Sequence, residues 1–258
     1  MTNSLVRTEK QRGVAHVILD RPAKRNALNA EMLTELVSTL RDCQADPSVR
    51  AIVISGSERG FAAGADIGTL ASANPIELYT SGFSEKWDEV AAISKPLIAA
   101  ISSYALGGGL ELALICDIVV ADETALFGMP EATIGIIPGA GGTQRLVRAI
   151  GKSMAMEMIL AGRRLDAREA KACGLISSIA ADGRPIADHA LEIAERIAQA
   201  APLAVTMAKA AILESFEAPL SAGIRFERSL SALITASDDR AEGMRAFAAK
   251  EPPLFTGQ

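Results

Sequence analysis

The segment from Lys95 to Asp117 limits what this chain can fold into more than any other. Residues 95–101 form a short stretch that is apolar and partly β-branched, which predicts a buried strand. Glycines 107–109 follow, and residues 110–116 predict a helix that is buried on most sides. A strand that turns through glycines into a helix brings unpaired backbone N–H groups together at the positive end of the helix dipole. Glycine lets a ligand approach that backbone closely, and Glu111 falls in the first helical turn, where a carboxylate is favoured.

The same segment also fits a tight turn in which Glu111 is an ordinary helix-start charge. A triple glycine is a weak signal, and it lacks the GxGxxG and GxxxxGK[ST] spacings of nucleotide-binding loops. The choice between a turn and a binding site therefore depends on other parts of the chain.

Further strands and helices alternate around this segment. Residues 13–19, 51–55 and 118–121 predict buried strands. Between the first two, Asn29 is the predicted N-cap of an amphipathic helix that ends at Asp46–Pro47. Strands separated by helical segments indicate an α/β fold with a parallel sheet.

Helical patterns dominate the second half of the chain, from Ser153 onward. A helical region outside an α/β core often closes over that core or contacts a neighbouring subunit. An earlier helix is predicted over residues 75–93, where Phe83 and Trp87 are spaced to share one face. The later predicted helices are 154–161, 167–173, 185–200, 202–215, 219–236 and 238–250, with Pro202 and Pro219 in first turns and residues 174–180 as a strand-like interruption.

The composition excludes several classes of protein. A net charge of −5 argues against a general nucleic-acid binder, and aromatic residues are only 4% of the chain. Three scattered cysteines do not form a disulfide framework, and two distant histidines have no metal-ligand spacing, so we expect no metal site. The chain shows neither a signal-peptide pattern nor an apolar run long enough to span a membrane, and we expect a cytoplasmic protein.

Two further loops carry candidate chemistry. Residues 60–67 directly follow a strand, at the edge where α/β folds collect ligands, although Asp66 also fits a capping role. Glu131 follows a proline and lies among apolar residues, which would raise the pKa of a general acid or base; an exposed loop glutamate is the alternative. Glycines in residues 139–142 suggest a phosphate loop, but the P-loop lysine is missing.

Taken in order, three motifs make the chain resemble the enoyl-CoA hydratase/isomerase family, also called the crotonase superfamily. They are Phe61-Ala-Ala-Gly-Ala-Asp-Ile67, Tyr104-Ala-Leu-Gly-Gly-Gly-Leu-Glu111, and Phe127-Gly-Met-Pro-Glu131 with Pro138-Gly-Ala-Gly-Gly-Thr-Gln-Arg-Leu146. Each motif is weak alone, and the ordered set is specific and covers nearly the whole chain. The resemblance implies a spiral of ββα units over residues 1–195. It also implies a helical region over residues 196–258 that covers the active site and builds homotrimers or homohexamers.

The resemblance also implies the site and the reaction. The backbone N–H groups of Ala65 and Gly108 would form an oxyanion hole for a thioester carbonyl. Glu111 and Glu131 would hold water for syn addition to a trans-2-enoyl-CoA, and the filled pair favours a hydratase over an isomerase. The alternatives are an enoyl-CoA isomerase, an aromatic-acid-pathway hydratase, or a non-catalytic acyl-CoA-binding or RNA-binding relative.

The implied coenzyme A contacts are less specific. A solvated basic loop is an equal alternative for Lys24 and Arg25, and Gly68 stands where some relatives carry a lysine. Phe247 and Lys250 are expected to reach the coenzyme A of a neighbouring subunit. We expect no cofactor, since coenzyme A is part of the substrate. The full set of expected contacts is Lys24, Arg25, Ala27, Ala63, Ala65, Asp66, Ile67, Gly68, Gly108, Phe247 and Lys250.

Overall fold

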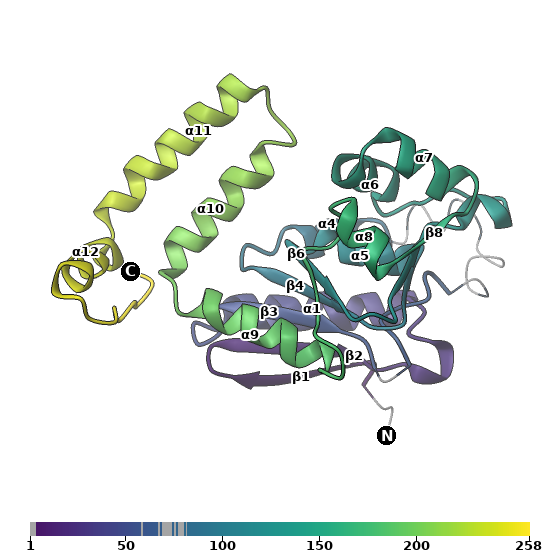
Figure 1. The fold of residues 1–258 in the computed structure, drawn as a ribbon, viewed down its shortest axis with the longest axis horizontal. Helices are drawn as coiled ribbons and strands as arrows, with labels where there is room; N and C mark the ends of the chain where they lie inside the picture. Colours follow the sequence, from purple (N-terminus) through teal and green to yellow (C-terminus); the bar gives the residue numbers. More distant parts are fainter. Residues whose placement is uncertain are drawn as a thin grey trace.

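The computed structural model describes residues 4–57, 59–66, 68, 74, 76, 80 and 82–258. The chain forms an α/β body and a helical arm that extends from one side of it (Figure 1).

A six-stranded sheet forms the centre of the body. Its strand order is β1-β2-β3-β4-β6-β9, and only the first pair is antiparallel. Alternate residues along the central strands face opposite sides of the sheet, so both faces are apolar. The strands are β1 (Val6–Gln11), β2 (Val14–Leu19), β3 (Ala51–Ser55), β4 (Leu97–Ile101), β6 (Ile118–Ala121) and β9 (Ser178–Ile179).

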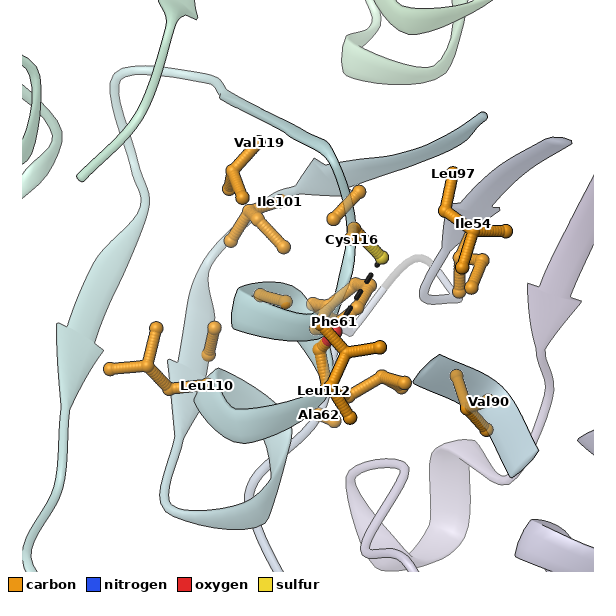
Figure 2. Close-up of a cluster of buried hydrophobic side chains, with 14 of the residues drawn as sticks. Ile54, Phe61, Ala62, Val90, Leu97, Ile101, Leu110, Leu112, Cys116 and Val119 are labelled. Atoms are coloured by element: carbon orange, nitrogen blue, oxygen red, sulfur yellow. Dashed lines mark hydrogen bonds between the residues drawn. The ribbon is translucent and has the colours of Figure 1, made fainter. Parts of the chain in front are cut away.

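Helices cover the two faces of this sheet. On one face, α1 (Ala30–Ala45), α4 (Glu85–Ala91) and α5 (Gly108–Ile115) contribute to the main hydrophobic core. Figure 2 shows part of that core, where Phe61 and Ala62 lie beside Leu112 of α5 and Val90 of α4. On the other face, the buried residues that α9 (Ile186–Ala198) contributes to a second core are alanines, and its partly buried isoleucines and leucine pack around them.

A second sheet positions the site segments. Its three strands are ordered β5-β7-β8, with β5 (Tyr104–Leu106) parallel to β7 (Leu126–Gly128) and β8 (Arg164–Asp166) antiparallel to β7. Strand β5 leads directly into Gly107, and β7 leads through Met129 and Pro130 to Glu131. The remaining short helices of the body are η1 (Pro22–Lys24), η2 (Glu131–Ile134), α6 (Gly142–Ile150), α7 (Lys152–Leu160) and α8 (Ala167–Ala172).

The arm consists of α10 (Pro202–Glu214), α11 (Leu220–Leu233), η3 (Ile234–Ala236) and α12 (Asp238–Ala249). Neither α10 nor α11 contains a buried residue. One polar anchor ties α10 to the body: Lys209 Nζ lies 2.8 Å from Asp117 Oδ2 and donates to the carbonyl oxygens of Ile93 and Lys95.

The segment after α12 folds back onto both the arm and the body. The N–H groups of Thr256 and Gly257 donate to the carboxylate of Asp239, which is only 2% exposed. Arg50 donates to the carbonyl oxygens of Phe255 and Ala198, so its side chain connects this segment with the end of α9.

The structure confirms most of the predicted elements. Asn29 caps α1 by accepting a hydrogen bond from Met32 N, and α1 ends at Ala45, next to the predicted Asp46–Pro47. Phe83 and Trp87 contact each other edge to face, with ring centroids 6.4 Å apart. Of the helix predicted over 75–93, α4 accounts for the last part, and residues 75, 77–79 and 81 lie outside the described residues.

Some sequence predictions differ from the structure. Pro219 is the N-cap of α11 and not a first-turn residue. Strand β1 was not predicted, because only Val6 of its six residues is buried and the edge strand lacks an apolar pattern. The predicted division after residue 195 falls inside α9, which continues to Ala198, and the two-part division remains a prediction.

No single helix among the described residues is long and apolar enough to cross a membrane. Helices α9 and α10 reach that length and composition only together, with a bend of 110° between them.

Candidate active site

The segment before the first site residue is held by a buried asparagine. Asn26 is fully buried with φ of 53°, a left-handed conformation that asparagine tolerates better than most residues. Its side-chain amide donates to the carbonyl oxygens of Gly60 and Phe61 at 2.9 and 3.0 Å. The loop around Asn26 is therefore fixed alongside residues 60–66.

Backbone pairing directs the Ala65 N–H away from this loop. Leu28 N donates to Gly64 O, and Asp66 N donates to Leu28 O, so Leu28 pairs with both neighbours of Ala65. Successive N–H groups of an extended chain point to opposite sides. The Ala65 N–H consequently points to the other side, and no described residue accepts a hydrogen bond from it.

The start of α5 supplies a second free amide. Gly107 has φ of 49° and ψ of −125°, which favours glycine at this turn, and it precedes the helix without a side-chain cap. The first N–H groups of a helix have no partner within it. Gly108 N therefore remains unpaired among the described residues, and a Cβ added to Gly108 would lie 3.4 Å from Ala65 N.

Gly109 brings these two segments close together. A Cβ at this position would lie 2.3 Å from Ala62 O and 2.8 Å from Ala62 Cβ, far inside van der Waals contact. Any side chain at Gly109 would push α5 away from residues 62–65. The gap between the amides of Ala65 and Gly108 thus depends on a glycine that bears no chemistry of its own.

Glu111 lies on α5, is 4% exposed and has one oxygen that is fixed by backbone donors. Its Oε1 accepts hydrogen bonds from Ala140 N at 2.7 Å and Gly142 N at 2.8 Å. Burial raises the pKa of Glu111, and these two hydrogen bonds oppose that rise. A Cβ at Gly142 would come within 2.9 Å of Oε1, so this glycine lets the loop close on the carboxylate.

Glu131 lies at the start of η2 and has the opposite environment. It is 8% exposed, and its buried Oε2 has no hydrogen-bond partner among the described residues. Burial raises the pKa of Glu131, a hydrogen bond from its own backbone N–H opposes that rise, and the charge of Glu111 adds to it. A Cβ at Gly107 would lie 2.7 Å from Glu131 Oε1, which places this carboxyl against the turn that precedes Gly108.

The four predicted residues with catalytic roles therefore gather at the start of α5. The two amides can bind an oxygen that develops negative charge, and the two carboxyl groups can exchange protons beside it. Among the described residues, no cluster of three or more His, Cys, Asp or Glu side chains has the arrangement of a metal site.

The residues of the loop before Leu28 are placed beside this site. Ala63 N donates to Arg25 O, and Ala27 O accepts from the guanidinium of Arg21. The side chains of Lys24 and Arg25 are exposed, an arrangement that suits either a phosphate contact or a solvated basic loop. Their contact with coenzyme A stays a prediction.

Asp66 has a structural partner that the sequence did not predict. Arg21 Nη1 lies 2.9 Å from Asp66 Oδ2, and this hydrogen bond lowers the pKa of Asp66. The pair ties the two loops together, so its carboxylate is already engaged. Gly68 is exposed, and Ile67 lies outside the described residues.

Phe247 and Lys250 are not part of this cluster within one chain. Phe247 is 85% exposed on α12, and Lys250 caps that helix in a left-handed conformation. The arm that carries them lies to one side of the body, away from α5 and α6 (Figure 1). The expected covering of the active site by this region is not made within one chain, and contact with a neighbouring subunit remains a prediction.

The sequence predicted the catalytic groups but not the residues that hold them in position. The side chains of Asn26 and Arg21 hold two loops in place, and Gly109 lets α5 approach residues 62–65. The backbone amides of Ala140 and Gly142 bind Glu111 whatever their side chains are. The apolar setting predicted for Glu131 holds for Phe127 and Met129, which are fully buried. It does not hold for Ile134, the last residue of η2, or for Ile136, which follows that helix; these side chains are 53% and 42% exposed.

The chain is similar to known proteins over nearly its whole length. The family profile described as enoyl-CoA hydratase/isomerase matches residues 9–258. A probable enoyl-CoA hydratase of Rhizobium meliloti is 47% identical over 255 residues, covering 99% of both chains. A 2,3-dehydroadipyl-CoA hydratase of Escherichia coli is 45% identical over 249 residues, covering 96% of this chain and 97% of that one.

The fold agrees with these similarities. A crystal structure of an enoyl-CoA hydratase subunit from Geobacillus kaustophilus superposes with a TM-score of 0.94 at 38% identity and covers 99% of both chains. A structure from Bacillus anthracis described as an enoyl-CoA hydratase gives a TM-score of 0.93 at 36% identity, covering 99% of this chain and all of that one. The chain therefore has the crotonase fold and belongs to the enoyl-CoA hydratase/isomerase family.

Proposed function

We propose that this protein is an enoyl-CoA hydratase, which adds water to a trans-2-enoyl-CoA and gives a 3-hydroxyacyl-CoA. The observation that carries the proposal is the pair of buried glutamates beside two unpaired amides. Its relatives from Rhizobium meliloti and Escherichia coli are both described as hydratases.

We infer the roles of the two glutamates from the difference in their hydrogen bonding. Two backbone N–H groups on Glu111 Oε1 favour its ionised form, whereas the unpartnered, buried Oε2 of Glu131 favours the protonated form. In a coupled pair that shares one proton, the proton therefore resides mainly on Glu131. We assign Glu111 as the base that accepts a proton from water, and Glu131 as the acid that gives a proton to the α-carbon.

The reaction balances with these two groups. The water oxygen bonds to the β-carbon as its proton passes to Glu111, and the double-bond electrons move toward the thioester carbonyl. The amides of Ala65 and Gly108 stabilise the oxygen that becomes negative, and each such donor is worth about 3 kcal/mol in acyl-transfer enzymes. Glu131 then protonates the α-carbon, and the proton on Glu111 returns to Glu131.

The substrate range and pathway are part of the proposal. We place the reaction in fatty-acid or related acyl-CoA degradation in the cytoplasm. Similar identity to a relative described as a 2,3-dehydroadipyl-CoA hydratase makes a dicarboxylic enoyl-CoA a second substrate candidate. Crotonyl-CoA, a long-chain enoyl-CoA and 2,3-dehydroadipyl-CoA, each followed by loss of the conjugated-thioester absorbance, separate these options.

We also propose that the chain works as a homotrimer or homohexamer. The support is the arm, where Ile212, Leu220 and Leu233 are 64%, 80% and 63% exposed and neither α10 nor α11 has a buried residue. Sedimentation of the active protein tests this, since a stable active monomer at micromolar concentration would contradict it.

The test of the reaction replaces each carboxyl with an amide of the same shape. We expect Glu111→Gln and Glu131→Gln each to lower kcat at least 100-fold with little change in KM, because both act mainly in the transition state. Glu31→Gln, an exposed first-turn residue of α1, is the matched control and should retain full activity. Near-normal turnover in either site variant would remove that glutamate from the mechanism.

A further inference from the structure

Met129 contacts the loop that holds Glu111, although no step of the proposed reaction uses it. Its side chain is fully buried, and a Cβ added to Gly142 would lie 2.7 Å from both its Sδ and its Cε. The same Cβ would lie 2.9 Å from Glu111 Oε1. The end of the Met129 side chain and the fixed oxygen of Glu111 therefore both lie on the side of Gly142 where another residue would carry its side chain.

The loop before α6 contains few side chains that could fix its conformation. Three of the four residues 139–142 are glycines, and Gly141, with φ of 99°, precedes α6 without a side-chain cap. Glycine has more backbone freedom than any other residue, so such a loop depends on contacts from outside for a single conformation. Two N–H groups of this loop bond to Glu111 Oε1, and the position of that carboxylate therefore depends on the same contacts.

The backbone that carries Met129 is anchored independently of this loop. Met129 directly follows β7, where Phe127 pairs with Ala105 of β5 on one side and Leu165 of β8 on the other. Glu131 comes only two residues after Met129. The segment that carries one glutamate thus also contacts the loop that holds the other.

We propose that Met129 is a positioning residue that keeps the amides of Ala140 and Gly142 bonded to Glu111. The inference deepens the proposed hydratase function and rests on it. Without the Met129 side chain, a cavity would open beside both Gly142 and Glu111 Oε1, and either group could shift into it. Hydrogen bonds weaken steeply when their distance and angle change, so the base would lose its fixed position.

The consequence is a slower chemical step with little change in substrate binding. A general base must lie within hydrogen-bond reach of the proton that it accepts, and a misplacement of about 1 Å can cost about 100-fold in rate. The thioester oxygen would be bound by the amides of Ala65 and Gly108, which belong to other segments. Loss of the Met129 side chain should therefore lower kcat much more than it raises KM.

The pH dependence of kcat gives a measurement that is specific to this role. Burial raises the pKa of Glu111, and the two backbone hydrogen bonds oppose that rise. If these bonds weaken, the pKa rises, and the acidic limb of the profile, where a protonated Glu111 cannot act as base, moves to higher pH. The charged groups on the segments around this carboxylate, Glu131 at the start of η2 and Arg145 on α6, are the same in every Met129 variant.

The experiment measures kcat, KM and the kcat–pH profile for crotonyl-CoA in wild type and three variants, with circular dichroism as the folding control. We expect Met129→Ala and Met129→Val, which lack atoms at the Sδ and Cε positions, to lower kcat about tenfold or more. Met129→Leu fills most of the same space and should keep kcat within about threefold of wild type. Met158→Ala is the matched control, because Met158 is fully buried in the same core on α7, and it should keep the wild-type kcat and pH profile.

The outcomes separate the two proposals. If wild type hydrates no enoyl-CoA thioester, the proposed function fails and the role of Met129 fails with it. If wild type is active and folded Met129→Ala has an unchanged kcat and acidic limb, only the positioning role of Met129 is wrong. An equal fall in Met158→Ala or in Met129→Leu would also overturn that role, because loss of the contact with Gly142 would then not be the cause. If Met129→Ala does not fold, Met129→Val decides the question.

Discussion

Helix α5 and the arm helices α10 and α11 are all rich in apolar residues, but the chain covers only the first. Every residue of α5 except Leu114 is buried, including its one charged residue, Glu111. Neither α10 nor α11 has any buried residue. The apolar content of a helix shows that it must be buried against a partner, but it does not show whether the partner is the same chain or another one. The site residues lie around α5, which is buried by its own chain, so a single chain fixes their geometry.

The largest difference between α5 and the arm should appear when one methyl group is added to a glycine in each. We expect Gly109→Ala to lower kcat/KM at least 100-fold, because its Cβ would meet Ala62 O at 2.3 Å and push Gly108 away from Ala65. In the arm, Gly223→Ala meets no atom within 4 Å and should stabilise α11 by up to about 1 kcal/mol. Kinetics and thermal unfolding of both variants provide the check, and equal effects would remove the contrast between the two helices.

The next effect concerns the polar anchor of the arm. Lys209→Ala leaves Asp117 and two carbonyl oxygens without this partner, at a cost of about 1–3 kcal/mol. Limited proteolysis should then cut near residues 199–201 before it cuts the body. Lys152→Ala, an exposed lysine at the start of α7, is the control. An unchanged cleavage pattern in Lys209→Ala would show that other contacts hold the arm.

A smaller effect tests the burial of charge at the site. The folded-state pKa of Glu131 is raised, so the unfolded chain ionises first as pH rises above about 4.3. The unfolding free energy of wild type therefore falls across the window between the unfolded and folded pKa values, by about 1.4 kcal/mol for each unit that separates them. Glu131→Gln lacks this loss. We expect its stability relative to wild type to improve between pH 4 and pH 8 in denaturant titrations; a constant difference would contradict the raised pKa.

The smallest effect on a single chain should come from the exposed apolar side chains of the arm. Ile212→Ser removes a side chain that is 64% exposed and should change the stability of one chain by less than about 0.5 kcal/mol. If the arm contacts another copy, the same substitution shifts the sedimentation coefficient toward smaller species. Unchanged sedimentation would place Ile212 outside any interface.

The sequence predicted those parts of the site that depend on residue type. Glu111, Glu131 and the glycine turn are chemical choices and can be read directly. The second sheet was missed, because β5, β7 and β8 have only three residues each and show no full period of alternation. The difference in hydrogen bonding between the two glutamates was not predicted either. It comes from the backbone N–H groups of Ala140 and Gly142, and every non-proline residue has such a group, so residue type gives no signal.

The return of residues 255–257 to Asp239 and Arg50 also has a consequence for amide hydrogen exchange. Amides near the end of a chain usually exchange within the time of mixing, since such segments open at almost no cost. Here Thr256 N and Gly257 N are bonded to a carboxylate that is 2% exposed, and Phe255 O is bonded to the body through Arg50. A peptide from this segment should therefore retain protection for as long as α12 stays docked. Its exchange rate then reports the position of the arm without any label.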